Sequence, residues 1–115
     1  MPKYLYMGCY TRETWSKLLD NPEDRTAAVQ KLAEAVGGRL ESIYWAFGAD
    51  DFVVIAEAPD DTAAAAISLA VGASGSVENV RTVKLISMDE GQAVLRKAKQ
   101  AAGAYTRPGA ATSRV

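Results

Sequence analysis

Residues Lys3–Tyr10 place apolar or aromatic side chains on both sides of one extended segment. Tyr4, Tyr6 and Tyr10 fall on one side of the alternation, and Leu5, Met7 and Cys9 fall on the other. A period of two is typical of a β-strand. Because neither side is polar, we expect this strand to be covered on both faces, unlike a strand of a sheet with one face in water.

The rest of the chain predicts further strands and helices in a defined order. Thr11 and Asn21 are typical helix N-caps, Gly37-Gly38 is a typical helix end, and Asp50-Asp51 lies in a turn. The predicted helices are residues 12–20, 22–36, 62–73 and 89–102, and the predicted strands are 3–10, 39–48, 52–57 and 77–87.

This order predicts an α+β fold of the ferredoxin-like β-α-β-β-α-β type. We expect an antiparallel four-stranded sheet with helices on one face and an extra C-terminal helix. A length of 115 residues allows one domain, which we place at residues 1–102, with residues 103–115 as a tail.

The aromatic side of the first strand predicts a partner. We expect Tyr4, Tyr6 and Tyr10 to lie opposite the helices, where a second copy of the same sheet is the simplest cover. The sequence therefore predicts a homo-oligomer that associates through the helix-free face of its sheet.

Composition excludes several chemistries. The chain has no histidine, the commonest general base and metal ligand, and its single cysteine cannot form an intrachain disulfide. The net charge of −1 argues against a dedicated nucleic-acid binder. No apolar run approaches the roughly 20 residues of a membrane helix, and no signal peptide is visible. We expect a cytoplasmic protein with no cofactor, no metal, and neither nucleic acid nor membrane as partner.

Two stretches resemble a known family. They are Phe47-Gly48-Ala49-Asp50-Asp51-Phe52-Val53-Val54-Ile55 and the following Glu57-Ala58-Pro59-Asp60. Together with the ending Tyr105-Thr106-Arg107-Pro108-Gly109, they are similar to the GYD-domain proteins, small bacterial and archaeal proteins named for a Gly-Tyr-Asp motif. The likeness spans about residues 3–109 and departs at Asp50, where the family often has tyrosine.

The resemblance implies a ferredoxin-like fold and oligomers, and it is also similar to the wider dimeric α+β barrel group. That group contains both small-molecule enzymes and binding proteins. The GYD-domain family itself has no established activity, so the resemblance supplies no catalytic residues.

The polar candidates for a site each have a simpler structural interpretation. Asp51, beside Asp50, could serve acid–base chemistry or hold a hard cation, but capping of its own turn accounts for it too. Arg25, near a helix N-terminus, predicts either an anionic ligand or a salt bridge to Glu23 or Asp24. Arg81, between valines, requires a carboxylate or anionic ligand if it points inward, or reaches water from an edge strand.

The aromatic candidates allow two interpretations. Tyr4, Tyr6, Tyr10 and Tyr44 could line a pocket for a flat apolar ligand, or they could serve sheet-to-sheet packing alone. Cys9 is expected to be a buried, slowly reacting thiol, since no histidine exists to activate it.

Two functions follow from these features. The first is a non-catalytic oligomeric module that binds a small ligand or a partner. The second is a cofactor-free enzyme acting on an acidic or phenolic small molecule, with Tyr and Asp as proton carriers and Arg as anion clamp. An enclosed cavity on which Tyr, Arg and Asp converge favours the enzyme.

The basic C-terminal end predicts one more contact. Residues 91–115 carry five basic residues and no acidic ones. We expect Arg107 to dock against the Asp50-Asp51 turn, with Tyr105 as an aromatic anchor.

Overall fold

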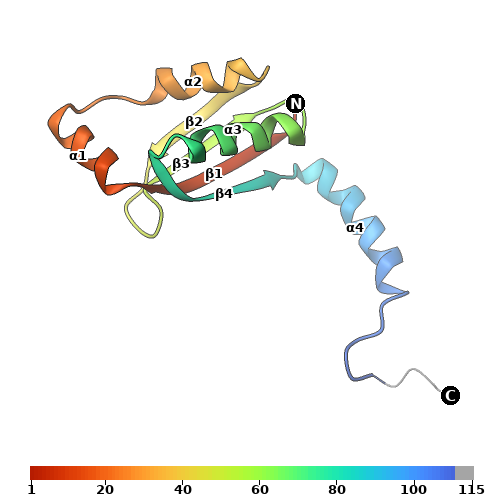
Figure 1. The fold of residues 1–115 in the computed structure, drawn as a ribbon. Coiled ribbons are helices and arrows are strands. Elements are labelled where there is room, and N and C mark those ends of the chain that lie inside the picture. The colour runs from red at the N-terminus through yellow and green to blue at the C-terminus, as the bar shows by residue number, and fades with distance from the viewer. Residues whose placement is uncertain (111–115) are drawn as a thin grey trace. The chain divides into compact units, whose positions relative to one another are not determined.

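The computed structural model describes residues 1–110, and the chain divides into two compact units, Met1–Leu85 and Ile86–Val115. The first unit contains seven elements along the chain (Figure 1). They are β1 (Lys3–Tyr10), α1 (Arg12–Asp20), α2 (Thr26–Ala35), β2 (Arg39–Trp45), β3 (Phe52–Glu57), α3 (Asp61–Ala73) and β4 (Val77–Leu85).

The four strands form one antiparallel sheet in the order β2-β3-β1-β4. The two central strands, β3 and β1, are not consecutive along the chain, because helical connections carry it from β1 to β2 and from β3 to β4. This is the order of a β-α-β-β-α-β unit. The predicted α+β, ferredoxin-like fold is confirmed.

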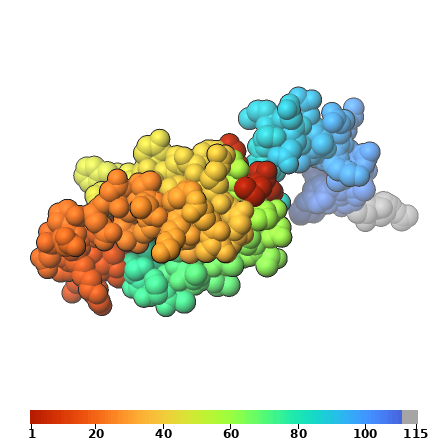
Figure 2. All heavy atoms as spheres, turned by 90° about the horizontal axis from the view of Figure 1, so that it is seen from above, coloured from red at the N-terminus to blue at the C-terminus, as the bar shows by residue number. Residues whose placement is uncertain are grey.

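The core lies between the sheet and the helices α2 and α3. Helix α2 packs on β2, and helix α3 packs on β4. In Figure 2 the atoms of α2 (orange) lie beside those of the α3–β4 segment (green). The buried cluster joins both central strands to α3, and side chains of α2 pack against it. Its buried members are Tyr4, Tyr6, Phe52, Val54, Ala56, Ala58, Ala64, Ile67 and Val77.

The side chains of β1 face the opposite way from the prediction. Tyr4 and Tyr6 are only 3% and 5% exposed, and the Tyr6 hydroxyl donates to the backbone oxygen of Ala64 in α3 at 3.0 Å. The tyrosines therefore pack under the helices and do not form the helix-free face. The side chains of β1 alternate as predicted, but alternation alone does not determine which side of the strand the helices cover.

The helix-free face carries the other set of β1 side chains, which includes Leu5 and Met7. The strand register places Leu5 beside Ile55 and Val83, and Met7 beside Val53. All five are only partly buried or exposed, and Val83 is 42% exposed. This face is therefore as apolar as expected, although different residues make it so.

The second helix begins later than predicted. Helix α2 starts at Thr26, and residues 22–25 precede it as a loop, so Pro22 does not open the helix. Asp24 Oδ1 accepts from the Thr26 backbone N–H at 2.9 Å, in place of a cap at Asn21. The predicted cap at Thr11 is confirmed, since its hydroxyl accepts from the amide of Thr14. Asp60 caps α3 in the same way, through the amide of Ala63.

The α2 end brings two backbones into close approach. Gly37 has φ +82° and donates to Glu34 O, while Gly38 donates to Ala33 O. These are the two bonds of a Schellman C-cap. A Cβ on Gly38 would lie 2.2 Å from the backbone oxygen of Glu57, so the chain can pass the end of β3 only with glycine there.

The second unit contains α4 (Met88–Ala102). Ser87 and Glu90 form a capping box at its N-terminus, so a helix is specified locally. No residue of α4 is buried, and Leu95 and Met88 are among its exposed apolar side chains.

Replacement of Gly38 by alanine tests the close approach to β3. We expect Gly38→Ala to lower the free energy of unfolding by roughly 1–3 kcal/mol, because the added methyl group must push backbone atoms apart. Gly72→Ala is the control: its Cβ meets no atom within 4 Å, and alanine stabilises a helix relative to glycine. Urea unfolding of both variants measures this, and equal midpoints for the two would contradict the packing described.

Candidate functional site

A cavity of about 360 Å³ lies between α2, α3 and the sheet. The strands contribute buried side chains such as Tyr6, Phe52 and Val54, and the helices contribute Leu32 and Ile67. Apolar side chains dominate the lining. Its polar members are Tyr6, Tyr10, Arg25, Ser68, Ser74 and Ser76.

Arg25 is the one charged residue of this lining. It is the N-cap residue of α2, and its Nη1 donates to Glu23 Oε2 at 3.0 Å. The predicted salt bridge is therefore present, on an exposed loop. The remaining N–H groups of the guanidinium have no partner within residues 1–110, so Arg25 retains donors for a ligand.

Tyr10 lies in a cluster of aromatic rings at the end of β1. Its ring centroid is 5.1 Å from that of Trp15 and 5.3 Å from that of Phe52, and Trp15 is 6.1 Å from Trp45. Edge-to-face and tilted packing of this kind fixes the orientation of a ring. The sequence does not indicate this cluster, because Trp15 in α1 and Trp45 in β2 lie far apart along the chain.

Asp51 holds this cluster in place. Its Oδ2 accepts from the Tyr10 backbone N–H at 3.0 Å and from Trp15 Nε1 at 3.2 Å. The carboxylate thus joins the start of β3 to the end of β1 and to α1. It does not line the cavity, and its hydrogen bonds give it a structural role.

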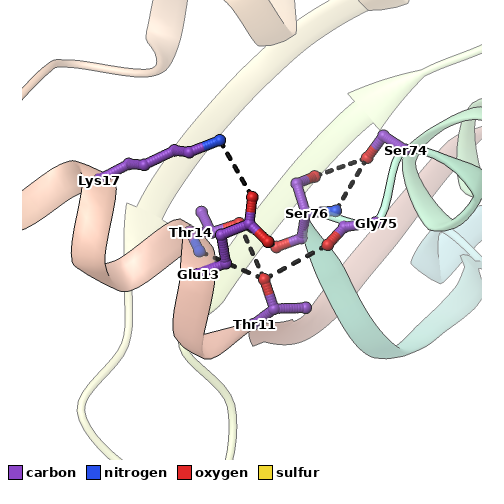
Figure 3. A network of polar contacts seen from close by, with 7 residues as sticks. All are labelled: Thr11, Glu13, Thr14, Lys17, Ser74, Gly75 and Ser76. Atoms are coloured by element: carbon purple, nitrogen blue, oxygen red, sulfur yellow. Dashed lines mark hydrogen bonds and ion pairs between the residues drawn. The ribbon is translucent and has the colours of Figure 1, made fainter.

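A polar network fixes the segment that follows α3, where two of the cavity serines lie (Figure 3). The Thr14 hydroxyl donates to the backbone oxygen of Ser76 at 2.8 Å, and Thr11 Oγ1 donates to that of Gly75 at 3.3 Å. Ser74 and Ser76 bond each other through their hydroxyls at 2.7 Å. The first turn of α1 therefore positions this part of the cavity wall.

Tyr4 and Tyr6 differ in their access to the cavity. Tyr6 lines it, whereas the Tyr4 hydroxyl donates to Asp61 Oδ1 at 2.6 Å. That hydrogen bond, with desolvation, raises the pKa of Tyr4 to about 12, and burial raises the pKa of Tyr6 to about 12. The bond from Tyr4, together with Lys84, lowers the pKa of Asp61. Both phenols therefore stay protonated at neutral pH.

Arg81 lies on the opposite face of the sheet. Its side chain is exposed on the edge strand β4, and its Nη2 pairs with Asp50 Oδ2 of the hairpin turn at 2.5 Å. Cys9 shares this face and is half-buried, which corrects the prediction of a buried thiol. Partial burial and the nearby Asp51 and Asp50 raise the pKa of the Cys9 thiol, which disfavours the reactive thiolate.

The structure thus brings together only part of the predicted site. Tyr6, Tyr10 and Arg25 line one cavity. The other predicted residues, Tyr4, Tyr44, Asp51 and Arg81, lie outside its lining. Asp50 and Asp51 make their contacts within Met1–Leu85, and docking of the tail stays a prediction. Arg114 and the other residues after 110 lie outside the described residues.

The family model of the GYD domain matches residues 4–95. The chain belongs to the GYD-domain family. No curated protein and no solved structure matches it significantly. The matched range includes the hairpin around residues 47–55, and in this GYD domain Asp50 of that hairpin is the partner of Arg81.

Residues 1–110 of this GYD domain offer neither a membrane-spanning helix nor a cluster of metal ligands. No helix in that range is long and apolar enough to cross a membrane. Within the same range, no three Cys, Asp or Glu side chains are grouped so as to hold a metal ion.

The role of Asp51 can be tested by removal of its carboxylate. We expect Asp51→Ala to lower the free energy of unfolding by about 1–3 kcal/mol, because two N–H donors lose their acceptor. The tryptophan emission of the folded protein should also change, since Trp15 loses its partner. Asp20→Ala, at an exposed residue of α1, should stay within about 0.5 kcal/mol of the wild type. An Asp51→Ala protein as stable as this control would show that the two bonds contribute nothing.

Proposed function

We propose that this GYD domain is a non-catalytic module that binds a small, largely apolar molecule in the cavity between α2 and α3. The observation that carries the proposal is the lining itself: a mostly apolar concavity with a few polar groups, among them Tyr6, Tyr10 and Arg25. Cavities of roughly 300–1,000 Å³ with this kind of lining are typical small-molecule sites.

The enzyme hypothesis has less support. Acid–base chemistry on an acidic or phenolic substrate would need a carboxylate that converges with Tyr and Arg on the reacting atoms. No Asp or Glu belongs to the cavity lining, and Asp51 already accepts two internal hydrogen bonds. Arg81 pairs with Asp50 on the other face. This separation supports binding over catalysis.

The binding proposal is tested by filling the cavity from either wall. Ala28 in α2 and Ala70 in α3 line the cavity and are exposed, so tryptophan at either position has room without overpacking the core. Ala66, exposed on α3 and outside the lining, is the matched control position.

We expect 1-octanol or octanoate to shift the amide NMR signals of the cavity residues in the wild type and in Ala66→Trp. In Ala28→Trp and Ala70→Trp, the ligand concentration that produces half of the maximal shift should rise at least tenfold. Absence of shifts in the wild type with both probes, or equal binding by all the variants, would contradict the proposal.

We also propose that a second copy of the chain covers the helix-free face of the sheet. The support is the apolar set Leu5, Met7, Val53, Ile55 and Val83, which no element of Met1–Leu85 covers. Sheet faces of this composition are typical of protein interfaces. We propose a cytoplasmic location as well, since the Cys9 thiol, which forms no disulfide, suits a reducing compartment.

A substitution that introduces a charge at the centre of the helix-free face tests the proposed oligomer. We expect the wild type to sediment as a dimer or larger species at micromolar concentration. Val53→Lys should sediment as a monomer, because the interface would have to bury an unpaired ammonium group. Leu69→Lys, at a 73% exposed position on α3, should leave the oligomer intact. A monomeric wild type would overturn this part of the proposal.

A further inference from the structure

We infer that the ligand of the α2–α3 cavity is an amphipathic anion, with an apolar body and a single carboxylate-type head group that binds Arg25 and Tyr10. This inference rests on the proposed binding function and names the class of ligand. The arguments come from the sign of the charge at the cavity, from unused hydrogen-bond donors and from the cavity volume.

The charge of the lining has one sign. Arg25 is its one ionised group, and no Asp or Glu side chain contributes to it. An ammonium group placed in this cavity would meet the Arg25 guanidinium and no carboxylate of the lining, since Glu23 lies on the loop outside it, whereas a carboxylate would meet a guanidinium. Hydrogen bonds between ionised partners are about twice as strong as neutral ones, so the lining discriminates in favour of an anion.

Tyr10 and Arg25 each have unused hydrogen-bond donors in the lining. The hydroxyl of Tyr10 has no hydrogen-bond partner within residues 1–110, and Arg25 uses one N–H group on Glu23. The Tyr10 ring is held by Trp15 and Phe52, and its backbone is held by Asp51. The phenol is therefore oriented before any ligand arrives, which lowers the entropic cost of binding.

Arg25 can accept a ligand without losing a buried contact. Its present partner, Glu23, lies on the loop before α2, and both side chains are more than a third exposed. Exposed ion pairs of this kind contribute little to stability. A ligand carboxylate can therefore share or replace Glu23 at small cost.

The volume limits the body of the ligand. A dry cavity of about 150 Å³ accommodates benzene, so about 360 Å³ suits one or two rings or a medium-length alkyl chain. A dinucleotide or a long-chain lipid would extend out of the open side of the cavity. Among the remaining polar lining groups, Ser74 and Ser76 bond each other and Tyr6 donates to Ala64 O. Ser68 and the apolar side chains are left to contact the body.

The test compares three probes with the same eight-carbon chain and different head groups. Octanoate, 1-octanol and octylammonium are titrated into the full-length protein by calorimetry at neutral pH. We expect octanoate to bind at least tenfold more tightly than 1-octanol, and octylammonium to bind most weakly.

Variants assign the preference to the two donors. Arg25→Gln should weaken octanoate binding about tenfold and leave 1-octanol binding unchanged, and Tyr10→Phe should weaken octanoate binding about threefold. Arg81→Gln is the matched control, since it makes the same change of charge on the other face of the sheet and should have no effect. Glu23→Gln should tighten octanoate binding two- to threefold, an effect that misfolding cannot mimic.

The outcomes separate the inference from the function on which it rests. If 1-octanol or octylammonium binds as tightly as octanoate, and Ala70→Trp still weakens binding at least tenfold, the cavity is a ligand site but the anionic class is wrong. Octanoate binding that is unchanged in Arg25→Gln also overturns the inference. If none of the three probes binds, the proposed function itself fails.

Discussion

The architecture of this GYD domain depends on how two helices cover a four-stranded sheet. Helix α2 packs on β2 and α3 packs on β4, the two edge strands, so the side chains of the central strands must fill the space between the helices. Tyr6 does so by reaching Ala64 in α3. The space that is left over is the cavity. The fold and the candidate site thus have the same origin.

The two faces of the sheet use charge differently. Under the helices, Arg25 has one exposed partner and unused donors. On the helix-free face, Arg81 is paired with Asp50, close to the apolar set that we propose as an interface. The hairpin turn thus carries a counter-charge for Arg81. At the cavity a guanidinium with unused donors meets an apolar surface, and this combination suits an amphipathic anion.

Much of the fold could be predicted from the sequence, because local signals specify it. The N-caps at Thr11 and Asp60, the glycine cap at Gly37 and the strand alternation each act over a few residues. The start of α2 was the exception. Pro22 is typical of a first helical turn, but Asp24 accepts from the amide and hydroxyl of Thr26 and sets the start four residues later. Pro22 and Asp24 are both good local signals for a helix start, and only the surrounding packing decides between them.

The sequence by itself determined the order of the elements, the family and the existence of two apolar sides on β1. Only the tertiary structure decided which side the helices take. Alternation determines which residues of a strand share a side. When both sides are apolar, it does not determine which side the helices cover. The same holds for the site. Tyr10, Arg25 and Ser76 are far apart along the chain, and strand pairing together with the polar network at the start of α1 brings them to one cavity.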